Sequence, residues 1–406
     1  MTGAPAPHAD PHNRAADLVA FTQSLVRIPS VFDPARGLDE SKAAECVEAQ
    51  MTAFGWKPTV ELVAPGRPNV FAVLEGSRPG PTLLFEGHLD VVTEGDPEKW
   101  TYDPFGAEIV DGLLYGRGSA DMKAGVAAMM WAAQEVATGP DFAGRIVVAA
   151  LVDEEGMMSG AKHFVANGHA RGVDAAIICE PEGREVCIAQ KGAIRVRVRA
   201  RGVMAHGAMP QHGRNPVAPL VRFLDRCADV QDSLQSEHGE HVLLGWDYVT
   251  PTVLHAGTFE QMNVISDRAS AAIDIRTTPN TNHDALIARL RELCGDDLEL
   301  DIIDDRPPTE TAGDHAVVSA IASAHRRVFG IEATVGGVPG STDGTVLWRD
   351  AGLPIVTYGP GGKWIAHQVD EFVEVAEITR AAEVYALAAR TFLGCLDTSV
   401  KGERRD

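Results

Sequence analysis

The sequence has little positive charge and no long apolar run, and each absence excludes a class of protein. Lysine and arginine total 36 against 57 acidic residues, which gives a net charge of −21. Nucleic acids and anionic membrane surfaces attract basic proteins, so neither is expected as a partner. No apolar run reaches the roughly 18 residues that a transmembrane helix needs, so no membrane span is expected either. The sequence therefore predicts a globular protein whose partners are small molecules or other proteins.

The sequence also lacks a paired-cysteine motif and a secretory signal. None of the six cysteines forms a C-x-x-C pair. The first residues, MTGAPAPHADPHNRAADL, contain no apolar core of the signal-peptide kind. Free thiols in a reducing compartment are therefore expected rather than three disulfides, and the predicted location is the cytoplasm. The glycines of residues 112–125 include no G-x-x-x-x-G-K-[ST] motif, which argues against a phosphate-binding loop.

What the sequence does contain is an alternation of strand-like and helix-like stretches. Apolar runs typical of buried strands occur at 69–76, 82–92, 145–152 and 174–180. An Ala- and Met-rich stretch at 122–137 is typical of a buried helix. This alternation predicts an α/β fold, with a sheet flanked by helices.

A change of pattern near residue 190 indicates an inserted domain. The stretch AIRVRVRARG (193–202) alternates apolar and basic residues, as in an antiparallel strand with one solvated face. After residue 297 the α/β pattern returns. We therefore predict an α/β catalytic domain made of two segments, 1–189 and 298–406, with an inserted α+β domain at 190–297.

Polar residues follow several of the predicted strands. The carboxyl ends of parallel strands meet at one edge of a sheet, so these side chains are expected to lie close together. They are His88, Asp90, Glu154, Glu155, Glu180 and His367, and Asp121, directly before a predicted helix, is considered with them. Two histidines with three of these carboxylates suit zinc, with cobalt or manganese as competitors.

Each of these residues also has a simpler interpretation. His88 alone could be a structural histidine, Asp121 could cap a helix, and Glu154 with Glu155 could form a solvated turn. Taken together, these interpretations leave several carboxylates at one sheet edge without compensation, which is costly. One or two divalent cations would offset that cost. Of the adjacent pair, one glutamate could then bind metal while the other acts as a general base.

Several motifs, in this order along nearly the whole chain, resemble those of the di-zinc aminoacylase and carboxypeptidase family. That family includes acetylornithine deacetylase, succinyl-diaminopimelate desuccinylase, aminoacylase-1 and glutamate carboxypeptidase. The matching stretches are FEGHLDVV (85–92), WTYDPFGAEIVDGLLYGRGSADMKAG (100–125), DEEG (153–156), CEPEG (179–183), AHGAMPQHGRNPV (205–217) and AHQVDE (366–371).

The resemblance implies a zinc-peptidase-like catalytic domain with two metal ions. By motif, His88 and Glu180 would bind one zinc ion. Glu155 and His367 would bind the other, and Asp121 would bridge the two. Cobalt or manganese could replace zinc. The resemblance thus assigns a ligand role to five of these seven candidate residues.

The remaining roles also follow from the resemblance. Glu154 would be the general base, and Asp90 would orient the imidazole of a metal-bound histidine. The inserted domain would be a lid and dimerisation domain. Within it, His206 would reach the neighbouring subunit's site and stabilise the oxyanion. Arg276 and Asn263 would hold the substrate carboxylate and the reacting carbonyl.

The function that these roles imply is hydrolysis of an amide bond in an N-acyl amino acid or a related small molecule, by metal-activated water. A homodimer is implied, and so is a cis peptide bond between Asp121 and Met122. Three alternatives stay open: a dipeptidase or carboxypeptidase, an enzyme for an unusual non-peptide C–N bond, and a non-catalytic metal-binding homologue. The last would be expected to lack Glu154 or a metal ligand, and all are present.

Overall fold

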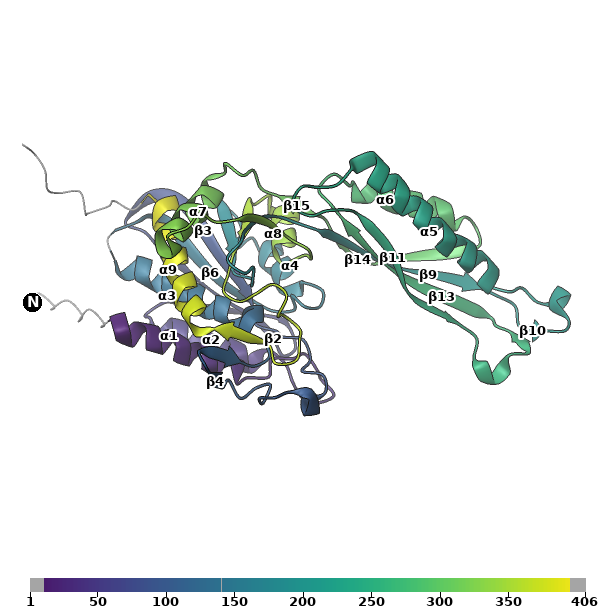
Figure 1. Ribbon diagram of the computed structural model, residues 1–406, viewed down its shortest axis with the longest axis horizontal. Coiled ribbons are helices and arrows are strands. Elements are labelled where there is room, and N and C mark those ends of the chain that lie inside the picture. The colour runs from purple at the N-terminus through teal and green to yellow at the C-terminus, as the bar shows by residue number, and fades with distance from the viewer. Residues whose placement is uncertain (1–10, 140, 395–406) are drawn as a thin grey trace, which may run out of the picture. The chain divides into compact units, whose positions relative to one another are not determined.

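A computed structural model describes residues 11–139 and 141–394, which form two compact units (Figure 1). The first unit comprises Met1–Ile188, Thr311–Gly336 and Thr342–Asp406. The second comprises Ala189–Glu310 and Gly337–Ser341. Within the described ranges, no helix has both the length and the apolar character that crossing a bilayer requires.

The first unit is built on a mixed sheet whose central strands are parallel. In order across the sheet, its strands are β1 (Thr59–Ala64), β2 (Arg67–Glu75), β6 (Ala143–Leu151), β3 (Arg78–His88), β7 (Ala175–Ile178), β17 (Ile355–Thr357), β8 (Val186–Gln190) and β15 (Thr309–Glu310). The short strand β16 (Val335–Val338) also pairs with β8. Strand β3 runs parallel to β6 and β7, and β17 runs parallel to β7. Consequently β6, β3, β7 and β17 all end at the same edge of the sheet, where the site described below lies.

Helices cover both faces of this sheet. They are α1 (Pro11–Val26), α2 (Ser41–Ala53), α3 (Ala124–Thr138), α4 (Ser159–Ala166), α7 (Ala316–Phe329), α8 (Gly344–Ala351) and α9 (Val375–Phe392). On one face α3 and α7 pack against α9, and Phe85 of β3 meets Tyr385 of α9. On the other face Leu84 and Val147 belong to a buried cluster with Phe164 of α4. Neighbouring residues of β3 thus enter different cores, because successive side chains of a strand point to opposite faces.

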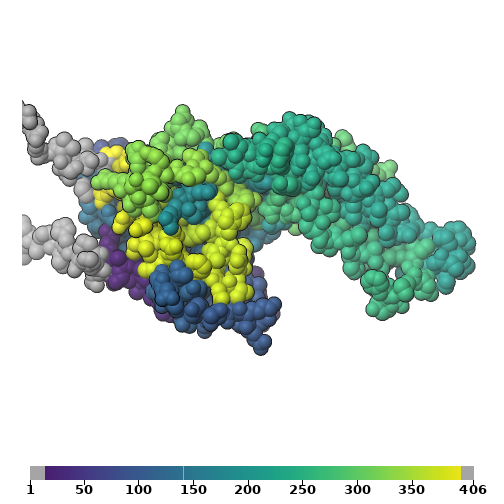
Figure 2. Space-filling model, in the orientation of Figure 1, coloured from purple at the N-terminus to yellow at the C-terminus, as the bar shows by residue number. Residues whose placement is uncertain are grey.

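A small antiparallel sheet lies beside the site-bearing segments. Its strands are β4 (Ile109–Val110), β5 (Leu113–Tyr115) and β18 (Phe372–Glu374), with the short helices η1 (Pro97–Lys99) and η2 (Ser119–Lys123) nearby in sequence. Phe372 pairs with Tyr115, which brings the C-terminal part of the unit to the segment before η2. Asp370 also accepts hydrogen bonds from the backbone and hydroxyl of Thr101, each at 2.8 Å. Figure 2 shows the corresponding yellow and dark blue surfaces directly adjoining.

The second unit is an antiparallel sheet with helices on one face. The sheet order is β11 (Tyr248–Ala256), β13 (Arg268–Thr277), β9 (Gly192–Arg201) and β14 (Leu298–Arg306). Helices α5 (Val217–His238) and α6 (His283–Cys294) pack on it around a core that includes Val196, Phe223 and Ile273. Shorter elements are β10 (Ala205–His206), β12 (Val264–Ile265), η3 (Pro210–His212) and η4 (Phe259–Gln261).

The observed fold confirms the predicted α/β class with an inserted α+β module. The alternation predicted for 193–202 is present, since buried and exposed residues alternate along β9 from Val196 to Arg201. The peptide bond between Asp121 and Met122 is cis, as expected. All five cysteines in the described ranges are free thiols, and Cys395 lies outside those ranges.

Candidate metal centre

The predicted ligands come from the ends of the parallel strands. His88 is the last residue of β3, Glu155 follows β6, and Glu180 follows β7. Asp121 lies within η2, directly before α3, and His367 lies between β17 and β18. All five residues belong to the first unit. Because these strands are parallel neighbours, ligands that are far apart in sequence meet at one sheet edge.

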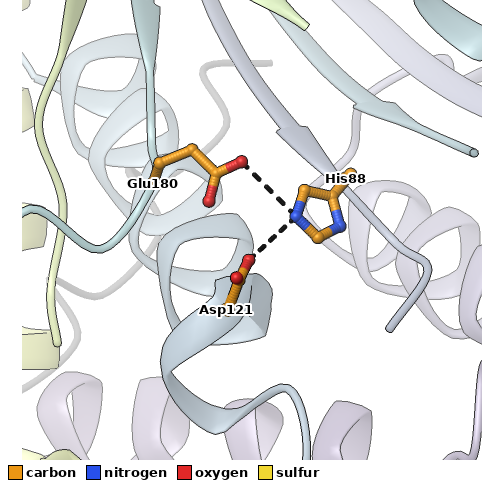
Figure 3. Close-up of side chains that lie close together, drawn as sticks. All are labelled: His88, Asp121 and Glu180. Atoms are coloured by element: carbon orange, nitrogen blue, oxygen red, sulfur yellow. Dashed lines mark hydrogen bonds and ion pairs between the residues drawn. The ribbon is translucent and has the colours of Figure 1, made fainter. Parts of the chain in front are cut away.

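The first group consists of His88, Asp121 and Glu180 (Figure 3). The imidazole Nε2 of His88 lies 3.0 Å from Asp121 Oδ1 and 3.4 Å from Glu180 Oε1. Gly125 allows this close approach: a Cβ there would lie 2.0 Å from the carbonyl oxygen of Cys179. Any larger residue would therefore push the start of α3 away from the chain that carries Glu180.

The second group consists of Asp121, Glu155 and His367. His367 Nε2 lies 2.8 Å from Glu155 Oε1 and 3.2 Å from Asp121 Oδ2. Asp121 therefore belongs to both groups, with Oδ1 facing one histidine and Oδ2 facing the other. His367 is the most exposed member, with half of its side chain accessible, whereas His88 is buried. The second group is thus the more open of the two.

The electrostatics of the two groups reflect burial and close charge pairing. Burial raises the pKa of Glu180 to about 8, and the negative charge of Asp121 adds to that rise. Burial raises the pKa of Asp121 less than hydrogen bonds from His367 and His88 lower it, so the net shift is downward. Hydrogen bonds to Asp121 and Glu155 raise the pKa of His367 to about 10, against the effect of burial. The groups attract positive charge strongly.

The donor set fits two divalent cations. Within each group the potential ligand atoms lie within 4.8 Å of one another. Imidazole nitrogens and carboxylate oxygens are the donors that zinc, cobalt and manganese accept. A two-metal site needs a bridging ligand between its ions, and Asp121 is placed to serve as one because its two oxygens face different groups.

Glu154 lies beside the ligands and belongs to another potential ligand group, with His88 and Glu155. Its side chain is buried, and burial raises its pKa well above the ordinary value, while the positive charge of His88 opposes the rise. Its backbone N–H donates to Asp90 Oδ1 at 3.1 Å. Glu154 is therefore a buried carboxylate whose backbone is held in place beside the potential ligands.

Asp90 makes different contacts from those that its expected role suggests. The Nδ1 atom of His88 lies 2.9 Å from the backbone oxygen of Asp90 but 3.6 Å from its carboxylate. The carboxylate accepts the backbone N–H groups of Glu154 and Glu155, each at 3.1 Å. Asp90 thus orients the histidine mainly through its carbonyl, and its side chain holds the turn that carries the two glutamates.

A second anchor of that turn was not predicted from the sequence. Arg67 pairs with Asp153 at 2.7 Å and with the buried Glu40 at 2.5 Å. Asp153 directly precedes Glu154 and has φ of 67°, in the left-handed region that non-glycine residues rarely adopt. The Arg67 contact therefore holds an unfavourable backbone conformation in place. No sequence signal links Arg67 with Asp153, because both are ordinary charged residues in their local contexts.

The remaining predicted residues lie in the second unit. His206 of β10 pairs with Val264 of β12, and Gly207 donates a backbone hydrogen bond to the carbonyl of Asn263 at 2.6 Å. His206 and Asn263 are therefore neighbours, and both are exposed. Arg276 lies near the C-terminal end of β13, where its guanidinium contacts Asp274 at 2.6 Å.

Comparison with known proteins gives consistent matches over most of the chain. The succinyl-diaminopimelate desuccinylase 2 of Ruegeria sp. (strain TM1040) is 32% identical over 406 residues, which cover 94% of this chain and 96% of that protein. A metallo-carboxypeptidase of the M20 family from Sulfolobus solfataricus has the same fold, with a TM-score of 0.77 at 19% identity over 93% of this chain and 99% of that one.

A third similar protein is the Bacillus subtilis YXEP protein, described as a dinuclear metal-binding peptidase of the M20 family. Its TM-score is 0.69 at 16% identity, over 95% of this chain and all of that one. The model of peptidase family M20/M25/M40 matches residues 84–391, which include every predicted metal ligand. With this match and a relative 32% identical over nearly its whole length, the chain belongs to peptidase family M20/M25/M40.

Proposed function

We propose that this hydrolase uses two divalent cations, most simply zinc, to cleave the amide bond of an N-acyl amino acid. The observation that carries the proposal is the shared position of Asp121, whose two carboxylate oxygens face His88 and His367 respectively. Glu180 and Glu155 complete the two groups. Cobalt or manganese would fit the same donors.

The protein's part in the reaction centres on Glu154. When bound, two cations would polarise the scissile carbonyl and lower the pKa of a water molecule towards neutrality. The Glu154 carboxylate accepts a proton from the attacking water and later delivers it to the nitrogen of the leaving amine. Asp90 holds the backbone of Glu154 throughout, since its carboxylate accepts that residue's N–H.

The second unit is proposed to serve as the lid and dimerisation domain. Arg276 would hold a substrate carboxylate as a two-pronged pair, for which its guanidinium would exchange Asp274 for the substrate. Asn263 would donate its amide to the reacting carbonyl, and His206 of a neighbouring subunit would stabilise the oxyanion. The exposure of His206 and Asn263 at one place in this unit supports a shared role there.

The substrate class rests on the relatives. The name of the Ruegeria relative favours an N-succinyl amino acid. The name of the Sulfolobus structure favours the alternative, a carboxypeptidase or dipeptidase, although its identity of 19% supports the fold alone. An unusual non-peptide C–N bond would suit the same centre. The five free thiols are consistent with a reducing location, and we propose the cytoplasm.

The experiment that tests this function is a hydrolysis screen on the purified, zinc-loaded protein. Its panel contains N-acetyl, N-succinyl and long-chain N-acyl amino acids together with dipeptides, and release of the free amine is measured. We expect release from an N-acyl amino acid that stops when a chelator is added and resumes when zinc is restored. Release from dipeptides alone would replace the deacylase function with a peptidase. No release from any substrate, with two ions bound, would contradict both functions and leave an unusual C–N bond.

The proposed in-trans role of His206 gives a separate prediction. His206→Ala should lower kcat by about 10² to 10³-fold, the usual cost of losing one oxyanion donor. Size-exclusion chromatography with light scattering should show the dimer intact. A mixture of His206→Ala and Glu154→Gln subunits, refolded or exchanged to equilibrium, should then recover about one quarter of wild-type activity. Half of the dimers would be mixed, and each would hold one complete site.

The mixed-dimer experiment distinguishes action of His206 on the neighbouring subunit's site from action on its own site. If His206 acted on its own subunit's site, every site in the mixed dimer would lack one essential group, and no activity would return. A monomeric wild-type protein would likewise contradict the in-trans role. His212→Ala is the matched control, because His212 is also an exposed histidine of the second unit, six residues away, and has no proposed role.

A further inference from the structure

Two charged side chains that the proposed mechanism does not use lie buried beside the metal centre. Arg117 and Glu371 are 2% and 0% exposed, and Arg117 Nη1 pairs closely with Glu371 Oε2. Removing two charges from water costs about as much as their attraction returns, so a buried ion pair is weak evidence for stability. Both side chains also make hydrogen bonds to the backbone of two proposed metal ligands, Asp121 and His367.

The carboxylate oxygen of Glu371 that does not pair with Arg117 holds the backbone of Asp121 in place. Glu371 Oε1 accepts the N–H of Ala120 at 3.0 Å and the N–H of Asp121 at 3.1 Å. In addition, the backbone carbonyl of Glu371 accepts the N–H of Gly116 at 2.9 Å. The glutamate therefore fixes the backbone at both ends of the 116–121 turn, and it does so without touching the carboxylate of Asp121.

The guanidinium of Arg117 contacts the backbone of His367, a ligand of the second group. Its Nη2 atom donates to the backbone carbonyl of His367 at 3.2 Å. His367 has φ of 65°, a left-handed conformation that is uncommon outside glycine. Such a conformation persists only where surrounding contacts hold it. Arg117 supplies one such contact, and Trp100 packs over the guanidinium with its ring centroid 5.3 Å away.

We propose that Arg117 and Glu371 form a positioning pair that sets the placement of His367 relative to Asp121. The pair thereby sets the affinity of the second group for its metal ion. The inference rests on the proposed two-metal function. Neither side chain touches a potential ligand atom, so both act through the backbone of the ligands. The link between Arg117 and His367 concerns only the second group, whereas the group of His88 and Glu180 keeps its own contacts.

The pair is best tested by removing both charges together. Arg117→Met alone would leave Glu371 as an unpaired buried charge, and such a variant could fail to fold. The double variant Arg117→Met/Glu371→Gln removes both charges, keeps an amide oxygen that can accept the N–H groups of Ala120 and Asp121, and deletes the donor to His367. The double variant therefore tests the loss of the contact to His367 without leaving an unpaired buried charge.

The measurement is a titration of metal-free protein with Co²⁺, followed by its visible absorption and by competition with a chelator. Wild-type protein should bind two ions. In the double variant one ion should bind about 10 to 100-fold more weakly, the usual cost of losing a residue that orients a ligand, while the other stays within about threefold of wild type. The kcat should be low at one equivalent of Co²⁺ and recover substantially at saturation.

The matched control is Arg306→Met/Asp304→Asn in the second unit, another buried arginine–carboxylate pair, with 2.6 Å between its charged atoms. It should change the melting temperature but neither metal affinity. Two affinities within about threefold of wild type in the folded Arg117/Glu371 variant would overturn the positioning role, since the expected loss is at least tenfold. Equal weakening of both ions would overturn it too. Fewer than two ions in wild-type protein would instead contradict the proposed function.

Discussion

Glu154→Gln is expected to lower kcat by about 10³-fold, within the range that general acid–base catalysis contributes. Glutamine has nearly the same size and can keep the buried turn in place, but it cannot accept a proton from water or deliver one to the leaving amine. Asp90 contacts the backbone of Glu154 and not its side chain, so the turn should keep its structure. Because Glu154 is not one of the five proposed ligands, both metal ions should remain bound.

The measurement is steady-state kinetics on the substrate found in the screen, with metal content determined on the same samples. Glu377→Gln is a matched control. Glu377 is a buried glutamate of the same unit that contacts Arg184 and the N–H of Gly361, and it has no proposed catalytic role. A Glu154→Gln enzyme with two ions and a kcat within tenfold of wild type would remove Glu154 from the mechanism.

Much of the site could be predicted because its ligands follow recognisable strands. The runs predicted at 82–92, 145–152 and 174–180 correspond to β3, β6 and β7, although each strand ends earlier than its apolar run. Polar residues after buried parallel strands have to gather at one edge, so the convergence of His88, Glu155 and Glu180 follows from the chain pattern. The pairing of His367 with Glu155 at 2.8 Å came from the family resemblance, since its loop has no periodicity.

The residues that hold the ligands in place could not be predicted in the same way. Arg67, Arg117 and Glu371 act through contacts between segments far apart in the sequence, and a charged residue carries no local signal of its distant partner. Glu371 lies inside a motif of the resemblance, but that motif specified no contact. Asp90 shows the same limit: its proximity to His88 was predicted, whereas its bonds to the 154–155 backbone were visible only in the structure.

The second unit was less predictable from sequence than the first. Strand β11 (Tyr248–Ala256) was not predicted, because Pro251 interrupts its pattern and most of its residues are exposed. Helix α5 ends in the mostly polar stretch 231–238, where the buried Leu234 continues the spacing of the apolar residues before it. The exposed strand β11, in contrast, takes its structure from its neighbour in space, β13.

Asp121→Asn is expected to abolish binding of both metal ions and to lower kcat/KM by about 10³-fold or more, since metal ions contribute several kcal/mol and each 1.4 kcal/mol is a factor of ten. Asp121 is the residue common to the two ligand groups, and an amide offers one weak oxygen donor in place of two charged ones. His367→Ala, by contrast, removes a ligand of the second group alone. It should leave one ion bound at the group of His88 and Glu180.

Metal content and thermal unfolding together separate these outcomes. At free zinc of about 100 times Kd, binding stabilises the wild-type protein by about 2.7 kcal/mol per site, so its melting temperature should rise with added zinc. The melting temperature of Asp121→Asn should not respond. Asp174→Asn is the control: Asp174 accepts the N–H of Thr82 at 2.8 Å just before β7, at the end of that strand away from the site, and it should keep the zinc response. If Asp121→Asn retained one tightly bound ion, Asp121 would belong to a single group. The two ions would then need another bridge, and Glu155, which lies near both histidines in the alternative ligand groups, would be the next residue to replace.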